Sequence, residues 1–168
     1  RLGLVTEDRK KNGLHLAHSI QENMALAALP RFTRWGLIHT PTLAPKVREL
    51  VVKLHIKLGS LANPVKSLSG GNQQKVAIAK WLLTSPAVLF LDEPTRGVDV
   101  GAKFEIYSLL AQLAAEGLAV VIASSELPEV VGLCHRVLVM REGRLAGELT
   151  GAQVEEKRIM ALAFGQET

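Results

Sequence analysis

An uninterrupted apolar run that ends in two acidic residues places the strongest constraint on how this chain can fold. Residues 87–91 are all apolar, and Asp92, Glu93 and Pro94 follow them directly. A strand without polar alternation is typical of a parallel sheet that is covered on both faces. The run therefore predicts a strand, buried on both faces, whose carboxyl end presents two carboxylates.

Helical and apolar segments alternate through the second half of the chain. A helix at 102–116 precedes a second buried strand at 118–123, and this order predicts an α/β fold with crossover helices between parallel strands. Ser19 with Glu22 three residues later has the pattern of a capping box. Further predicted elements are a strand at 2–5, helices at 19–29, 70–84, 127–134 and 151–164, a helix from Pro45 to 58, strands at 136–140 and 144–149 joined by a tight turn, and an irregular connection at 30–45.

Composition argues against several classes of protein. The net charge is +4 and no block of five like charges occurs, so a nucleic-acid-binding arm is not expected. Cys134 is the only cysteine, which excludes an internal disulfide and favours a reducing, cytosolic setting. No run of eighteen apolar residues is present, so no membrane-spanning segment is expected.

The segment before the predicted helix at 70–84 has the chemistry of a phosphate cradle. Ser69, Gly70 and Gly71 stand where the helix begins, and the first amides of a helix have no intrahelical acceptor. Glycines let an anion approach these amides closely, and the helix dipole favours negative charge there. Taken alone, the same three residues could form no more than an N-cap.

The paired carboxylates after the apolar strand suggest metal-assisted chemistry. The carboxyl edge of the strands is where α/β sheets bind ligands. Asp92 could orient a Mg²⁺ ion, through water because Mg²⁺ dehydrates reluctantly, and Glu93 could polarise an attacking water. The alternative is a charged strand end that Pro94 closes with a turn.

Together these motifs resemble those of the ATP-binding subunits of ABC transporters. The resemblance rests on LSGGNQQ at 68–74, VLFLDEP at 88–94, TRGVD at 95–99 and TEDRKKNGL at 6–14. The residues of these motifs are most similar to the C-terminal half of the duplicated ATPases that serve bacterial importers of ribose, galactose and xylose. The resemblance implies a P-loop NTPase-like ABC ATPase domain with a parallel core sheet and a helical subdomain.

The resemblance also implies an internal organisation for this partial domain. A helical and signature subdomain would span about 8–83, and an α/β core with Walker B, D-loop and switch region about 84–150. A C-terminal helix would occupy 151–168. In the family, the surface of the helical subdomain meets the membrane permease, so Trp35 is either a contact to that partner or a locally packed side chain.

The signature motif and the D-loop of the family correspond to matching positions here. Ser69, Gly70, Gly71 and Gln73 would contact the γ-phosphate of an ATP molecule held by the opposite domain of a sandwich dimer. Asp99 would be the D-loop aspartate that communicates between the two ATP sites.

The remaining site residues combine matches with departures. Asp92 corresponds to the Walker B carboxylate that binds Mg²⁺, and Glu93 to the catalytic base. Glu7 stands where the family usually has the Q-loop glutamine and could also approach the metal, whereas Ser125 stands in place of the switch histidine. Because serine has no imidazole to bond the γ-phosphate, the site containing Glu93 is expected to hydrolyse ATP below the full rate.

No G-x-x-x-x-G-K-[ST] stretch occurs in the 168 residues. The family places this Walker A loop and its strands upstream of Arg1, whose neighbours read like the middle of a fold. Without the loop's amides and lysine the chain has no strong hold on the β- and γ-phosphates of its own nucleotide. The chain by itself is therefore expected neither to bind nor to hydrolyse ATP appreciably.

The resemblance implies the energy-coupling subunit of an ABC sugar importer, with ATP and Mg²⁺ as cofactors. Its partners would be a second ABC ATPase domain and transmembrane permease subunits, with no nucleic acid. It would be cytoplasmic and peripheral, held at the inner face of the cell membrane through the permease. The alternative is a non-catalytic dimerisation module that donates its signature motif to a partner's ATP site. A DNA-linked ABC ATPase is disfavoured because neither coiled-coil heptads nor a basic groove is found.

Overall fold

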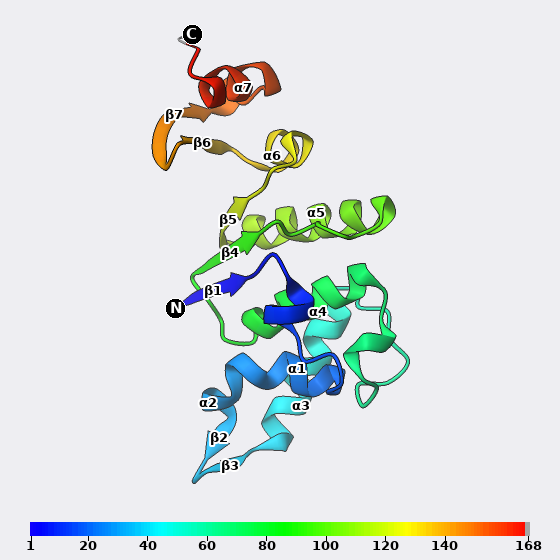
Figure 1. The fold of residues 1–168 in the computed structure, drawn as a ribbon. Helices are drawn as coiled ribbons and strands as arrows, with labels where there is room; N and C mark the ends of the chain where they lie inside the picture. Colours follow the sequence, from blue (N-terminus) through cyan, green and yellow to red (C-terminus); the bar gives the residue numbers. More distant parts are fainter. Residues whose placement is uncertain (167–168) are drawn as a thin grey trace. The chain divides into compact units, whose positions relative to one another are not determined.

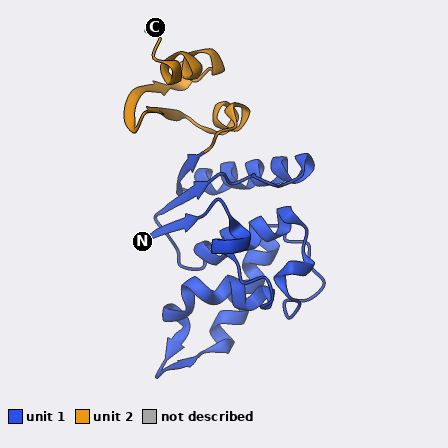
Figure 2. Ribbon diagram, viewed as in Figure 1, with its two compact units in different colours: residues 1–123 blue, residues 124–168 orange. Residues whose placement is uncertain are grey.

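A computed structural model describes residues 1–166 (Figure 1). The chain divides into two compact units, one up to Ala123 and one from Ser124, which Figure 2 distinguishes by colour. The first unit contains β1 (Leu2–Val5), η1 (Arg9–Gly13), α1 (Ile20–Ala25), η2 (Leu26–Ala28), α2 (Leu29–Phe32), β2 (Thr33–Arg34), β3 (Leu37–Ile38), α3 (Thr40–Lys53), η3 (Val65–Ser67), α4 (Gly70–Leu82), β4 (Val88–Asp92), α5 (Val100–Ala115) and β5 (Ala119–Ala123). The second contains α6 (Leu127–Leu133), β6 (Arg136–Arg141), β7 (Arg144–Thr150), η4 (Gly151–Gln153) and α7 (Glu156–Phe164).

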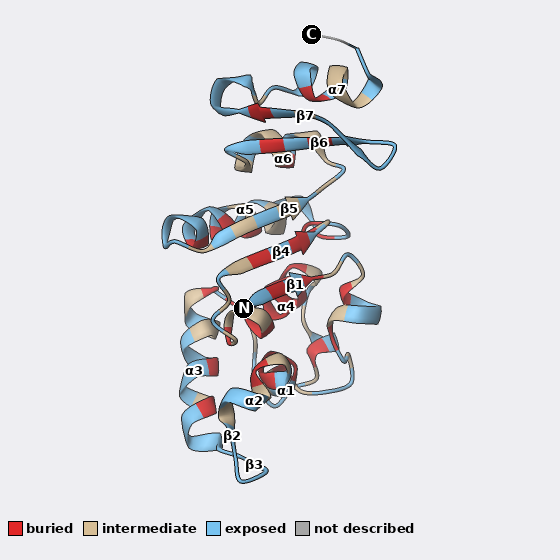
Figure 3. Cartoon of the chain, turned by 90° about the vertical axis from the view of Figure 1, so that its left-hand side faces the viewer, coloured by how far each residue is buried: buried red, intermediate tan, exposed pale blue. Residues whose placement is uncertain are grey.

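The first unit is built on a parallel sheet with the strand order β1-β4-β5, which confirms the predicted α/β class. The prediction that the apolar run is buried on both faces is wrong. Leu89 and Leu91 of β4 are buried, but Phe90 between them is 38% exposed. Its register neighbours, Leu4 on β1 and Val121 on β5, are exposed as well. No residue of β5 is buried, so the prediction of a second buried strand is also wrong. Within this unit one face of the sheet therefore carries the packing, and the other presents a row of apolar side chains. Figure 3 colours each residue of the strands by its burial.

Helix α4 lies at the centre of the first unit. Most of its side chains are buried, including two lysines whose charged ends have partners. Lys75 Nζ lies 2.7 Å from a carboxylate oxygen of Glu105 on α5, and Lys80 Nζ donates to the carbonyl oxygen of Gly13 at 2.6 Å. Hydrogen bonds from Lys75 and then Lys57 lower the pKa of Glu105, whereas burial lowers the pKa of Lys80. These contacts fix α4, and with it the helix start at Gly70, against its surroundings.

The predicted capping box at the start of α1 is confirmed. The Ser19 hydroxyl accepts from the amide of Glu22 at 3.1 Å, and the Glu22 carboxylate accepts from the amide of Ser19 at 2.8 Å. The hydrogen bond from the Ser19 hydroxyl and the bond from its amide together lower the pKa of Glu22. α1 is shorter than predicted, because η2 and α2 complete the segment up to Phe32.

Ser19→Ala is expected to lower the free energy of unfolding by about 1 kcal/mol, because one amide at the start of α1 loses its acceptor. Glu22→Gln should cost less, since its amide oxygen can still accept from the amide of Ser19. Chemical denaturation of both variants checks the order. Equal losses would contradict this order and would mean that the charge of the Glu22 carboxylate contributes as much to the cap as the Ser19 hydroxyl does.

The segment at 30–45 is ordered, contrary to the prediction of an irregular connection. β2 and β3 form a two-residue hairpin whose turn residues, Trp35 and Gly36, have φ values of 54° and 79°. Left-handed backbone at both positions matches a type I′ turn. Trp35 is 91% exposed, so the interpretation as a locally packed side chain is wrong.

Helix α3 begins at Thr40, five residues before the predicted start at Pro45. Pro41 occupies the first turn, where a missing amide proton costs little. Pro45 lies inside the helix and removes the hydrogen bond that would reach the carbonyl of Pro41. The helix ends at Lys53 rather than at residue 58.

The second unit has its own small core. β6 and β7 pair antiparallel through a turn in which Glu142 and Gly143 both have positive φ values, as the predicted tight turn requires. The predicted helix at 151–164 is divided into η4 and α7. Burial raises the pKa of the Cys134 thiol, as expected of a side chain that fills space rather than reacts. The core residues of this unit are Val137, Val139, Leu149 and Ile159. Across residues 1–166, no helix is long and apolar enough to span a bilayer.

Candidate functional site

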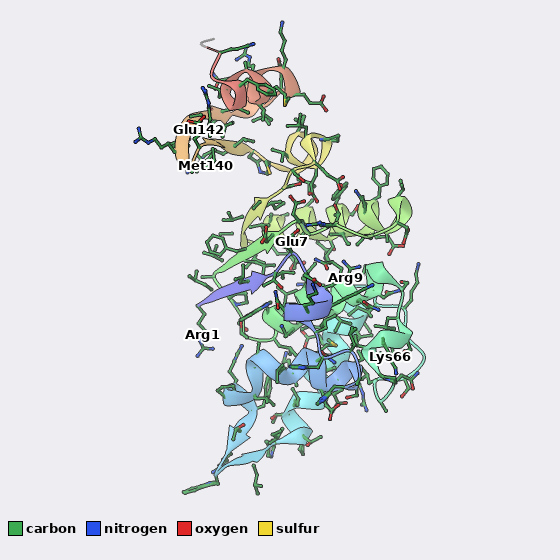
Figure 4. All side chains as sticks on the ribbon, in the orientation of Figure 1. Arg1, Glu7, Arg9, Lys66, Met140 and Glu142 are labelled. Atoms are coloured by element: carbon green, nitrogen blue, oxygen red, sulfur yellow. The ribbon has the colours of Figure 1, made fainter. Side chains whose placement is uncertain are left out.

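The carboxyl edge of the sheet gathers several of the predicted site residues. Val5 at the end of β1 pairs in register with Leu91 of β4, so the segments that follow both strands emerge side by side. Glu7, on the first of these segments, forms an ion pair with Arg96 on the second. Figure 4 labels Glu7 together with Arg9 from the same segment. Asp92 ends β4 and is exposed at this edge.

Glu93 occupies an uncommon backbone conformation. Its φ of 46° lies in the left-handed region, which costs a non-glycine residue on the order of 1–3 kcal/mol. The conformation is held from both sides. The Glu93 amide donates to the carbonyl of Ala123 at 2.8 Å, and its carbonyl accepts from the amide of Arg96 at 3.1 Å. Strain of this kind is typical of functional positions.

The turn after Glu93 leads into α5 through a cap. Pro94 and Thr95 are buried, and Gly97 has a φ of 65°, which turns the chain toward the helix. The Asp99 carboxylate accepts from the amide of Ala102 at 2.9 Å and caps α5. Asp99 itself is exposed, so the cap leaves its side chain at the surface. Its predicted role in communication between ATP sites stays a prediction.

The start of α4 combines an accessible cap with a tight helix contact. Ser69 is exposed, and its hydroxyl accepts from the amide of Asn72 at 3.4 Å and from the side-chain nitrogen of the same residue at 3.0 Å. Gly70 is half-buried. Gly71 is buried because α5 passes close to it, and a Cβ there would lie 2.5 Å from the Cβ of Ala102. The amides of Gly70 and Gly71 have no acceptor within the helix and could bind an anion.

Gln73 is the member of the predicted signature set whose side chain points inward. It is 7% exposed, and its Nε2 donates to the carbonyl of Leu68 at 2.9 Å. Its Oε1 is buried and has no hydrogen-bond partner among residues 1–166. The side chain therefore braces the loop before α4, and its predicted contact with phosphate stays a prediction.

Arg9 also belongs to this region, although no sequence pattern predicts a role for it. Its Nη1 donates to the carbonyl of Arg96 at 2.8 Å and its Nη2 to the carbonyl of Gly97 at 3.0 Å. The side chain is 6% exposed, and burial lowers the pKa of Arg9 while the charge of Asp8 opposes that shift. A run of charged residues, 7–11, conceals it in the sequence, because nothing in such a run marks which member turns inward.

Ser125, the residue in place of the switch histidine, belongs to the second unit. It follows Ser124, whose hydroxyl donates to the Glu129 carboxylate and accepts from the amide of Glu126. The other predicted site residues all belong to the first unit, where they lie after β1, at the end of β4, at the start of α5 and at the start of α4, namely Glu7, Asp92, Glu93, Asp99, Ser69, Gly70, Gly71 and Gln73.

The donor set at the sheet edge suits a hard cation that is also bound by phosphate. Asp92 offers exposed carboxylate oxygens, and Glu7 offers a carboxylate that would have to exchange its ion pair with Arg96 for the metal. Mg²⁺ usually binds one or two carboxylates and completes its coordination with water and substrate phosphates. Among residues 1–166 there is no group of three or more His, Cys, Asp and Glu side chains that could hold a metal alone. These residues therefore fit a Mg²⁺ ion that phosphate oxygens and water also bind.

Comparison with known proteins gives a consistent result. Residues 2–96 match the family model described as ABC transporter. A putative ribose/galactose/methyl galactoside import ATP-binding protein of Geobacillus kaustophilus is 50% identical over 98% of this chain, which covers 33% of that protein. A xylose import ATP-binding protein of the same organism is 47% identical over 98% of this chain, which covers 32% of it. The chain thus spans about a third of the length of the curated relatives it matches.

Solved structures share the fold. The cbiO1 structure from Clostridium perfringens, described as part of an ABC transporter complex, superposes with a TM-score of 0.74 at 27% identity, covering 95% of this chain and 61% of that one. The dimeric structure of MJ0796, a bacterial ABC transporter cassette, has a TM-score of 0.74 at 24% identity, covering 89% of this chain and 62% of that one. The second likeness concerns the fold alone.

Proposed function

The chain belongs to the ABC transporter family, and on that premise we propose that it is part of the ATP-hydrolysing, energy-coupling subunit of a sugar importer. One observation carries the proposal. The carboxylates that end β4 and the accessible start of α4 lie in one unit, and the turn after β4 passes close to that start, since a Cβ built on Gly70 would lie 3.2 Å from the carbonyl oxygen of Gly97. An ATPase of this kind needs a metal-binding carboxylate, a base for water and a second surface that closes on the terminal phosphate.

The proposed binding roles follow the chemistry of each side chain. Ser69 and the amides at Gly70 and Gly71 bind the γ-phosphate of an ATP molecule that a second ABC ATPase domain presents. Gln73 supports this surface through its bond to the carbonyl of Leu68. When bound, Mg²⁺ neutralises developing charge on the phosphates, and Asp92 is its principal protein ligand.

Hydrolysis is assigned to the remaining carboxylates and to the switch position. Glu93 accepts a proton from the attacking water. Glu7 would be a further carboxylate ligand of a bound Mg²⁺ ion if its ion pair with Arg96 opened. Ser125 offers a hydroxyl where an imidazole would serve, so turnover at this site is slower than at a site with histidine. Asp99 lies at the surface where the opposite domain would close.

Partners and location are part of the same proposal. The names of the relatives point to import of ribose, galactose or xylose, and an ATPase for such import requires transmembrane permease subunits. The protein would then be cytoplasmic and held at the inner face of the membrane through the permease. Trp35 and its hairpin offer an exposed contact for that partner. The matches to import ATP-binding proteins favour this function over the non-catalytic alternative.

The test compares the full-length protein with the 168-residue chain. The full-length protein is expected to hydrolyse ATP, and removal of Mg²⁺ with a chelator should abolish turnover because the phosphate charge is then unscreened. The 168-residue chain should show no micromolar MgATP binding in calorimetry, since its sequence contains no Walker A loop. Mg²⁺-independent turnover by the full-length protein, or tight MgATP binding by the shorter chain, would overturn these assignments.

A further inference from the structure

Glu7 and Arg9, both on the segment that follows β1, contact the segment that follows β4. Glu7 pairs with the guanidinium of Arg96, and Arg9, two residues later, bonds the carbonyls of Arg96 and Gly97. The first contact is exposed, with Arg96 and Glu7 side chains 66% and 42% accessible, whereas Arg9 is buried. An exposed pair contributes little to stability, so the buried contact by Arg9 is the stronger connection.

The geometry of the Arg9 contact exploits the shape of the guanidinium. Two of its nitrogens reach two consecutive carbonyls, and a planar fork of donors fixes both distance and orientation. Lysine has a single ammonium group on a flexible stem and cannot reproduce this fork. Removing the guanidinium would leave two carbonyls without the partner that positions them.

The same side chain also reaches the start of α4. A Cβ built on Gly70 would lie 3.1 Å from Arg9 Nη2 and 3.2 Å from the carbonyl oxygen of Gly97. Arg9 therefore lies where three segments meet: the loop after β1, the turn after β4 and the first turn of α4. Each of these segments carries a residue of the proposed ATP site, namely Glu7, Asp99 and Gly70.

We propose that Arg9 is a positioning residue of the ATPase. It holds the turn from Arg96 to Asp99 in a fixed place relative to Glu7 and to the start of α4, so that a shift in one segment moves the others. This inference rests on the proposed function. Arg9 touches neither nucleotide nor metal in this role, and it acts through the backbone carbonyls that it binds.

The test uses the full-length protein with Arg9→Ala, Arg9→Lys and Lys10→Ala. Arg9→Ala is expected to lower kcat for ATP hydrolysis by roughly 10- to 100-fold, the scale of a small displacement of positioned groups. KM for ATP should change little, because the lost contact is not a ground-state contact to the nucleotide. Arg9→Lys should fall between Arg9→Ala and the unaltered protein, and Lys10→Ala, on an exposed neighbour, should leave kcat unchanged.

Amide hydrogen exchange separates failure of this inference from failure of the proposed function. The amides of Arg96 and Val98 bond within the turn after β4, and both should exchange faster in Arg9→Ala and Arg9→Lys but not in Lys10→Ala. This readout does not depend on hydrolysis. If the unaltered protein does not hydrolyse ATP, the proposed function fails whatever the exchange rates are.

Two results would overturn the positioning role itself. One is unchanged exchange of these amides in Arg9→Lys, the variant that keeps the charge and most of the side-chain volume. The other is a fall in kcat/KM for Arg9→Ala that comes only from KM. If Arg9→Ala does not fold, as judged by its thermal transition, Arg9→Lys carries both measurements.

Discussion

Glu93→Gln in the full-length protein is expected to reduce ATP turnover at its site by roughly 10²–10⁴-fold, the contribution of a positioned general base. Glutamine has nearly the same shape as glutamate but cannot accept a proton from water at neutral pH. The left-handed backbone at position 93 is equally unfavourable for both residues, so the variant should fold as the unaltered protein does. Phosphate release under saturating MgATP measures the effect.

The matched control is Glu142→Gln, the same chemical change at an exposed turn residue of the second unit that also has a positive φ value. Its turnover should equal that of the unaltered protein. Because a duplicated ATPase has a second site, the rate is best followed in a protein whose other site is already inactive. Turnover that survives Glu93→Gln in that background would remove Glu93 from the role of base.

Gly71→Ala is expected to lower the free energy of unfolding by about 1–3 kcal/mol, the usual cost of overpacking. The new methyl group would lie 2.5 Å from the Cβ of Ala102, and neither atom belongs to a side chain that can rotate away. α4 and α5 must then separate, which also moves the helix start that carries Ser69 and Gly70. Chemical denaturation measures the loss.

The exchange of the two residues is the sharpest control. The double variant Gly71→Ala, Ala102→Gly places the methyl group on the opposite helix and restores the space between α4 and α5. Its free energy of unfolding should return close to that of the unaltered protein, apart from the cost of up to about 1 kcal/mol for a glycine within α5. A double variant as unstable as the sum of both single variants would show that the contact is not the cause.

Local signals made much of the first unit predictable. The capping box at Ser19, the helix start after Ser69 and the strand before Asp92 are each determined by a few adjacent residues, and the structure confirms their positions. The start of α3 was harder to predict. Either Pro41 or Pro45 could stand in the first turn of a helix, and only the surrounding fold decides which one does.

Long-range packing accounts for what the sequence did not reveal. Whether Phe90 is buried depends on what covers the second face of the sheet, and no pattern within β4 records that. Arg9 meets Arg96 and Gly97 across 87 or more positions of sequence, so its inward orientation had no local signal. The inward side chain of Gln73 has the same explanation, because the neighbouring segments bury it.

The exposed row of Leu4, Phe90 and Val121 affects how the chain behaves in solution. Water is released when two such apolar rows pack against each other, and this favours association of two chains. Sulfate or phosphate strengthens the association because these ions are excluded from protein surfaces. Solutions that contain crowding agents or much sulfate will therefore favour aggregation of the 168-residue chain. Calorimetry of the chain is best done in dilute chloride buffers, because the heat of aggregation would otherwise be mistaken for the heat of nucleotide binding.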